Sequence, residues 1–241
     1  MKTLGIIGGL GPESTVDYYR SIIAVYREKT GGEGYPPLVI VSLDVDKGLR
    51  LLGANQLQEM AEYLAGGARQ LAAAGADFAL LSANSGHIVF DELRQASPIP
   101  LISIVETTCE EVSRQQLKTV GLLGTRFTMA GRFYFDVAEK HGLRLMVPTA
   151  EEQAWIHDKY VNELLRGAFL PETREGLTQI VATMKQRDGI EGVVLAGTEL
   201  PLILRAECIA GLPLFDTTQI HVRAAVEEMF GGVEARPVAP M

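Results

Sequence analysis

Short apolar runs alternate with longer segments of helical period along most of the chain. The first run, residues 4–7, is followed by a glycine-rich turn and by a helix that starts near Glu13. Further strands are predicted at 38–43 and 78–81, and further helices at 56–74 and 220–230. Continuous apolar strands separated by helices indicate a parallel sheet covered on both faces. In such sheets, ligands bind beyond the carboxyl ends of the strands.

The strand segments occur twice, in the same order and at nearly the same offset. Residues 3–9 are echoed by 119–125, residues 79–85 by 193–199, and residues 99–101 by 212–214. Three echoes in one order favour an internal duplication over the general similarity of strand–helix units. We therefore expect an α/β fold of two pseudo-symmetric αβα halves, with the ligand site in the cleft between them.

The repeat also suggests how the chain is divided. We expect the first half to comprise residues 1–103 together with 216–230, and the second half to comprise residues 104–215. A short crossover near 102–116 would join them, and the helix near 220–230 would pack back on the first half. The tail, residues 231–241, is expected to be frayed.

Composition excludes several classes of function. Lys and Arg number 22 against 30 Asp and Glu, and there is no basic run, so neither nucleic acid nor an anionic membrane surface is an expected partner. No apolar run reaches the ~18 residues that span a bilayer. The two cysteines, Cys109 and Cys208, lie in predicted helices with no metal or redox spacing, which indicates a reduced, cytoplasmic compartment. No metal site is predicted, because His141 and His221 lack partners at metal spacing.

The turn after the first strand contains Gly9, Leu10 and Gly11. It lacks the G-x-G-x-x-G spacing of a dinucleotide site, so its glycines serve either a tight turn or a cluster of backbone N–H groups suited to a carboxylate.

Other polar residues follow later strands or lie on predicted helices, and each has a structural alternative. Asn84, Ser85, Thr198 and Glu199 either bind a ligand at a strand end or form turns and helix caps. Thr125 and Thr128 stand three residues apart at the start of a helix, where they would suit an anion. Arg50 would pair with a distal carboxylate and Lys159 would also bind substrate, unless both are solvated helix residues.

The motifs together resemble the aspartate/glutamate racemase family, and most of all its broad-specificity amino-acid racemases related to aspartate racemase. They are GGLGPEST at 8–15, ANSGH at 83–87, GTRFT at 124–128, VNEL at 161–164 with Gly167, GTEL at 197–200 and FDTT at 215–218. The resemblance covers roughly residues 1–230. It implies a two-domain pseudo-symmetric fold, a small amino acid as ligand, and no pyridoxal phosphate or other cofactor.

The resemblance also implies chemistry that this chain departs from. Racemisation removes the α-proton from one face of the substrate and returns a proton to the other, and the family uses two cysteines for these steps. Here Ala83 and Gly197 stand at the two cysteine positions. We therefore expect no measurable racemisation of aspartate or glutamate. Asp46, His87 and Glu199 are the candidate replacement bases.

Three readings remain open. The first is a racemase-family enzyme acting on a small acidic amino acid or related carboxylate through a substitute base. The second is a single-base lyase or isomerase, and the third is a non-catalytic carboxylate-binding protein. The expected partner is a small molecule, and a homodimer is left open.

Overall fold

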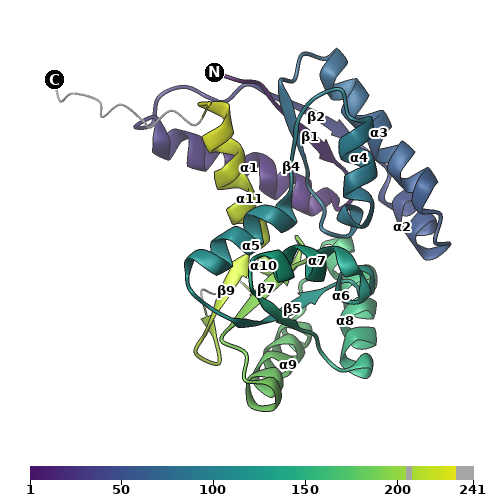
Figure 1. The fold of residues 1–241 in the computed structure, drawn as a ribbon, viewed down its shortest axis with the longest axis vertical. Helices are drawn as coiled ribbons and strands as arrows, with labels where there is room; N and C mark the ends of the chain where they lie inside the picture. Colours follow the sequence, from purple (N-terminus) through teal and green to yellow (C-terminus); the bar gives the residue numbers. More distant parts are fainter. Residues whose placement is uncertain (205–207, 232–241) are drawn as a thin grey trace.

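The computed structural model describes residues 1–204 and 208–231. Its elements form two sheets, one above the other along the long axis of the molecule (Figure 1). The predicted fold class, α/β with two largely parallel sheets, is confirmed. The tail prediction for 232–241 lies outside the described residues.

The first sheet has the strand order β2-β1-β3-β4, and all its pairings are parallel. Its elements, with the helices between them, are β1 (Leu4–Gly8), α1 (Pro12–Lys29), β2 (Leu38–Ser42), α2 (Val45–Gly53), α3 (Leu57–Ala73), β3 (Phe78–Leu81), the 3₁₀ turn η1 (Ser85–Val89), α4 (Phe90–Ala96) and β4 (Leu101–Ile102).

The second sheet has the order β6-β5-β7-β9-β8, in which only the short edge strand β8 is antiparallel among the described pairs. Its elements are α5 (Ile104–Arg114), β5 (Thr119–Gly124), α6 (Arg126–Ala130), α7 (Arg132–Lys140), β6 (Arg144–Met146), α8 (Ala150–Asn162), η2 (Leu164–Arg166), α9 (Pro171–Asp188), β7 (Gly192–Ala196), α10 (Leu200–Leu204), β8 (Cys208–Ile209), β9 (Leu212–Asp216) and α11 (Thr217–Met229). Apart from β8, the order repeats that of the first sheet, so β5 corresponds to β1 and β7 to β3.

The crossover near 102–116 contains the helix α5, whose apolar face packs on the second sheet, so the prediction that Cys109 lies in a helix is confirmed. The same prediction for Cys208 needs correction. Cys208 lies in β8 and not in a helix, because Cys208 and Ile209 pair with the start of β9.

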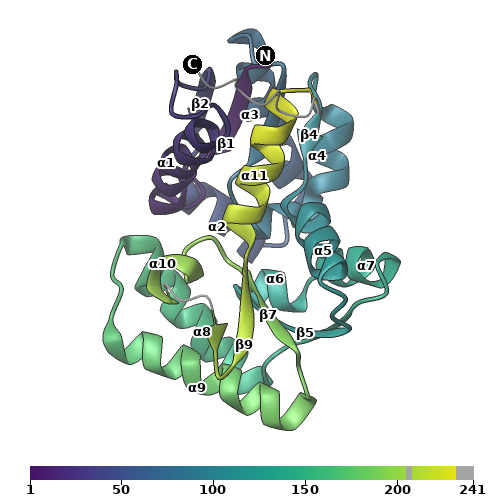
Figure 2. The same ribbon diagram turned by 90° about the vertical axis from the view of Figure 1, so that its left-hand side faces the viewer.

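The last helix, α11, lies beside both α1 and α5 (Figure 2). Its apolar face joins Tyr18 and Ile22 of α1 in one core cluster. The Tyr18 hydroxyl is buried there and needs a partner, which it finds in Nδ1 of His221 at 2.9 Å.

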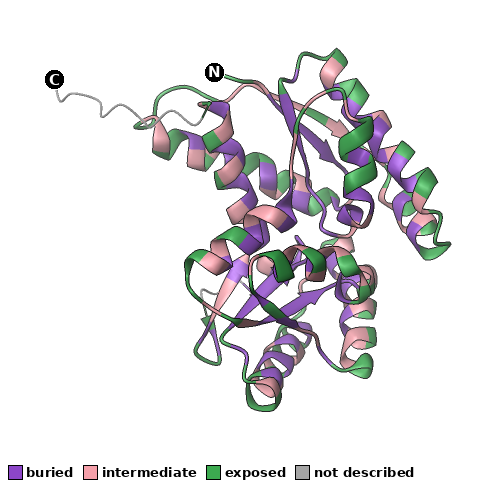
Figure 3. Cartoon of the chain, viewed as in Figure 1, coloured by how far each residue is buried: buried purple, intermediate pink, exposed green. Residues whose placement is uncertain are grey.

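The central strands of both sheets are buried, while the outer helix faces are exposed (Figure 3). No helix within residues 1–204 and 208–231 is long and apolar enough to cross a membrane.

Candidate functional site

The carboxyl ends of β3 and β7 meet at a small cavity between the two sheets. The cavity has a volume of about 40 Å³. It is lined by Leu10, Val45, Gly48, Leu49, Leu52, Met60, Ala83, Asn84, Ser85, Gly86, Thr125, Tyr160, Leu165, Thr198 and Glu199. Loops from both halves therefore contribute to one site, and a substrate larger than a few water molecules must displace part of the wall.

Tyr160 of α8 fills the space that a side chain at position 197 would occupy. A Cβ atom built on Gly197 would lie 2.5 Å from Cε2 of Tyr160 and 2.9 Å from its hydroxyl oxygen. Gly197 does not have a positive φ, so close packing and not backbone geometry requires the glycine here. The tyrosine hydroxyl thus takes the place of the missing side chain.

Glu199 is the ionisable partner of Tyr160. Its Oε2 atom accepts hydrogen bonds from the Tyr160 hydroxyl and from Oγ1 of Thr198, the latter at 3.0 Å. Glu199 is 1% exposed, and its Oε1 atom lies beside Gly11. The Ser14 hydroxyl is close enough to lower the pKa of Glu199, but no hydrogen bond of normal geometry reaches Oε1 from the residues that the structure describes. Burial raises the pKa of Glu199 above its ordinary value, and the bonds from Tyr160 and Thr198 offset part of the rise. A buried carboxyl with a raised pKa is a candidate for acid–base chemistry.

Among the residues that the structure describes, the opposite side of the cavity carries no titratable side chain. Ala83 is 8% exposed and lines the cavity. Its neighbour Asn84 accepts a hydrogen bond from the Tyr134 hydroxyl at 2.6 Å and donates one to Oγ1 of Thr217 at 3.2 Å. The amide is therefore held by Tyr134 of α7 and Thr217 of α11. It can present polar atoms to a ligand but cannot exchange a proton near neutral pH.

Three hydroxyl groups meet beside this amide. Oγ of Ser85 lies 2.7 Å from Oγ1 of Thr125 and 3.2 Å from Oγ1 of Thr128, and the two threonine oxygens are 3.3 Å apart. Thr125 also caps α6, where its hydroxyl accepts from the Thr128 backbone N–H. The cluster joins the two halves. Only Ser85 and Thr125 line the cavity, while Thr128 lies behind them.

The glycine turn after β1 offers fewer free backbone N–H groups for a substrate carboxylate than its sequence suggests. Gly9 has φ +82°, and a Cβ there would meet the Leu43 carbonyl at 2.1 Å, so its role is conformational. Its N–H donates to Oγ1 of Thr15 at 2.9 Å and is therefore not free for a substrate carboxylate. Leu10 lines the cavity. Gly11 makes room for Glu199, because a Cβ on Gly11 would lie 2.1 Å from Oε1 of that residue.

The structure does not place His87 as a replacement base. Its Nδ1 lies 2.9 Å from the Ala83 carbonyl, and its Nε2 accepts from the Ile104 N–H at 3.3 Å. Burial lowers its pKa to about 3, so the ring is neutral and its nitrogens are engaged in holding the chain. His87 lies outside the cavity lining.

Asp46, Arg50 and Lys159 do not reach the cavity either. Asp46 and Arg50 are exposed on α2. Lys159 pairs with Glu163 one turn along α8. Of the three candidate bases, only Glu199 lies at the cavity.

The functional residue that the sequence analysis missed is Tyr160. It lies in the helix that carries Lys159, and no pattern in that helix distinguishes it from a core tyrosine. The available signal was Gly197 itself, since a missing side chain at a buried site must be compensated by a neighbour. Tyr134 was missed because its contact with Asn84 joins distant segments. Thr217 was noted as part of the FDTT motif, but its bond to Asn84 was not foreseen for the same reason.

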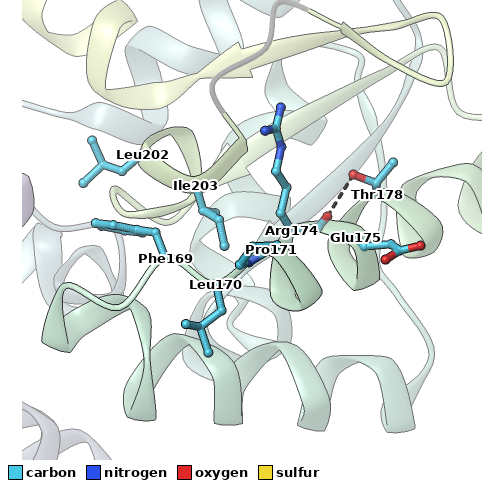
Figure 4. Close-up of a pocket in the computed structure, with 8 residues that line it drawn as sticks. All are labelled: Phe169, Leu170, Pro171, Arg174, Glu175, Thr178, Leu202 and Ile203. Atoms are coloured by element: carbon cyan, nitrogen blue, oxygen red, sulfur yellow. Dashed lines mark hydrogen bonds between the residues drawn. The ribbon is translucent and has the colours of Figure 1, made fainter.

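A larger groove lies elsewhere, between α9 and α10, with Phe169, Leu170 and Ile203 around it (Figure 4). Its volume is about 600 Å³, but its charged residues, Arg174 and Glu175, are exposed. The ionisable group at the smaller cavity, Glu199, is buried instead, and loops from both halves meet there, so we place the functional site at the smaller cavity.

Comparison with known proteins assigns the chain to a family. Residues 7–225 match the family model described as Asp/Glu/Hydantoin racemase, and the chain belongs to that family. The predicted resemblance is thereby confirmed at the level of the family.

Individual relatives extend over nearly the whole chain. The chain is 25% identical to the broad-specificity amino-acid racemase RacX of Bacillus subtilis over 232 residues, which is 92% of this chain and 96% of that protein. A structure of an aspartate racemase homologue from Pyrococcus horikoshii is 33% identical, with a TM-score of 0.81 over 95% of this chain and all of the other. A Yersinia pestis structure assigned to the Asp/Glu racemases is 31% identical, with a TM-score of 0.84 and the same coverage.

Proposed function

We propose that this protein catalyses a single-base reaction at the α-carbon of a small carboxylate, with Glu199 as the base. The observation that carries the proposal is the difference between the two sides of the cavity. On one side lies the buried carboxyl group of Glu199, whose Oε1 atom has no hydrogen-bond partner of normal geometry among the described residues. On the other side lies Ala83. A base on one face can remove and return a proton there, but inversion needs a donor on the opposite face.

In this mechanism each residue around Glu199 has a separate role. The ionised carboxylate of Glu199 takes the α-proton of the substrate through Oε1 and later returns it. Tyr160 and Thr198 hold Oε2 and so fix the direction of Oε1. On the other side, Asn84 and the hydroxyls of Ser85 and Thr125 bind the substrate carboxylate and stabilise the negative charge that develops as the proton leaves. No pyridoxal phosphate takes part in the proposal.

The proposal keeps two outcomes for the deprotonated substrate. After the proton on Glu199 has exchanged with solvent, the substrate can take a deuteron back on the same face, which gives exchange with retained configuration. It can instead lose a substituent, which gives a lyase reaction. Both require one base only. Racemisation of the family type is excluded by the proposal, because Ala83 has no proton to give.

The test is α-proton exchange in D₂O, followed by NMR, with chiral chromatography of the recovered substrate. The panel should contain amino acids, hydroxy acids and dicarboxylic acids. We expect deuterium at the α-carbon with retained configuration, or loss of a substituent. Inversion at the rate of exchange would overturn the single-base assignment. Binding by calorimetry without exchange or loss of a substituent would overturn catalysis in favour of a binding protein.

A further inference from the structure

One wall of the cavity is apolar, and it is built largely by one face of α2. Val45, Leu49 and Leu52 line the cavity at positions i, i+4 and i+7, together with Gly48 between them. This spacing places them on one side of the helix. Leu10, Met60 and Leu165 complete the wall from three other segments.

Three cations on helices that line the cavity, Lys47, Arg50 and Lys159, are absent from its lining. Lys47 lies with its ammonium 4.2 Å from the centre of the Tyr63 ring, and Arg50 is exposed. Lys159 is paired with Glu163. No lysine, arginine or histidine is among the described residues that line the cavity, and its titratable side chains are Tyr160 and Glu199.

This composition disfavours a substrate with a second carboxylate. A side-chain carboxylate entering the apolar wall would lose its hydration without gaining a cation, and it would also approach the like charge of Glu199. An aliphatic side chain would instead gain from leaving water, by about fourfold in the binding constant for each methylene. The Leu and Met side chains of the wall can change rotamer to admit it.

We infer that the substrate is a monocarboxylate with a small aliphatic side chain, and that aspartate and glutamate are poor ligands. This inference rests on the proposed function for the position of the reacting carbon. It departs from the expectation of an acidic amino acid, because Arg50, the expected partner of the distal carboxylate, lies outside the cavity.

The experiment compares ligands of matched shape by titration calorimetry. Leucine has the outline of aspartate with two methyl groups in place of the carboxylate oxygens, and 4-methylpentanoate bears the same relation to succinate. The second pair lacks the amino group, so the comparison does not depend on its recognition. We expect the aliphatic member of at least one pair to bind 100-fold or more tightly than its dicarboxylate.

A substitution on α2 then tests whether this wall sets the preference. Leu49→Arg brings a cation to the cavity and should improve the binding of aspartate or succinate at least tenfold relative to the aliphatic partner. Leu51→Arg is the matched control. Leu51 has similar exposure but lies outside the cavity, in a separate groove that it lines together with Leu57 and Tyr63. The control should keep the wild-type preference.

The outcomes separate the inference from the proposed function. Dicarboxylates that bind the wild-type protein as well as their aliphatic partners would overturn the inference, and so would an absence of binding by both aliphatic ligands. Aliphatic ligands that bind but show neither α-proton exchange nor loss of a substituent would support the inference and refute the proposed function. Aspartate that binds tightly and exchanges its α-proton with retained configuration would refute the inference and support the proposed function.

Discussion

The loops that follow β3 and β7 occupy equivalent places in the two halves but differ in chemistry. After β3, Ala83 and Asn84 present a methyl group and an amide whose polar ends are both hydrogen-bonded. After β7, Gly197 makes room for Tyr160, and Glu199 presents a carboxyl oxygen. A repeated fold therefore holds an asymmetric site, with the titratable groups Tyr160 and Glu199 on the β7 side and an amide and a methyl group on the β3 side.

The difference shows that two halves of similar topology can carry different side chains at equivalent strand ends. The backbone positions of the strand ends depend on the sheets, which both halves preserve. The chemistry depends on two or three side chains, which change without disturbing the strands. Fold similarity to racemases thus defines the scaffold, while the reaction must be argued from these side chains.

The strongest test of the asymmetry is the removal of the base on the β7 side. Glu199→Gln keeps the shape and the hydrogen-bonding oxygen but cannot accept a proton at neutral pH. We expect turnover, followed by α-deuterium incorporation or by substrate loss, to fall by about 10²–10⁴-fold with little change in melting temperature. Glu28→Gln, on the exposed face of α1, is the control and should have wild-type activity. Unchanged activity in Glu199→Gln would assign the proton transfer to another group.

A second test restores the cysteines. In Ala83→Cys with Gly197→Cys, the new side chain at 197 collides with the Tyr160 ring, so we expect a loss of about 1–3 kcal/mol of stability and no inversion. Adding Tyr160→Leu opens the space, and this triple variant should invert the substrate slowly. Chiral chromatography and thermal melting measure both effects. A stable double variant that racemises would show that Tyr160 moves aside easily.

Much of the scaffold could be predicted from the sequence because its signals are local. The apolar strands 4–7 and 78–81 and the repeated spacing of their echoes follow from residues close together along the chain. The same holds for the start of α1 near Glu13. Such signals depend on burial and periodicity, which require no knowledge of the partner segment.

The site could be predicted only in part, because it depends on contacts between distant segments. Glu199 was found through its place after a strand, but its partner Tyr160 comes from a helix 39 positions earlier. Arg50 and Lys159 were chosen by residue type, and only the orientation of their helices shows that they face away from the cavity. Residue type identifies candidates, while side-chain direction selects among them.

A third test compares matched tyrosines on the two sides. The Tyr160 hydroxyl donates to Glu199 and lowers its pKa, so Tyr160→Phe should raise that pKa. The base must be ionised, so the rising limb of the pH–rate profile should move to higher pH. Tyr134→Phe removes the bond to the Asn84 amide, which does not titrate, and should leave the limb in place. Equal shifts in the two variants would contradict the assignment of Glu199.

The smallest effect concerns His87, which ends the loop after β3. Burial lowers its folded pKa to about 3, so the unfolded chain binds a proton first as the pH falls below about 6.5. The stability that neutral His87 contributes is present above pH 6.5 and is lost toward pH 3, by up to about 1.4 kcal/mol per pH unit. Asp216, whose pKa burial raises to about 6, acts in the opposite direction.

The variant His87→Asn isolates this contribution, because Asp216 is present in both proteins. Asparagine can still donate to the Ala83 carbonyl but does not titrate. We expect its unfolding free energy, measured by urea denaturation from pH 7 to pH 4, to decline less steeply than that of the wild-type chain. The pH–rate profile should keep its shape, since His87 lies outside the cavity. A profile that loses a limb in this variant would place a proton-transfer group on the β3 side and end the asymmetry.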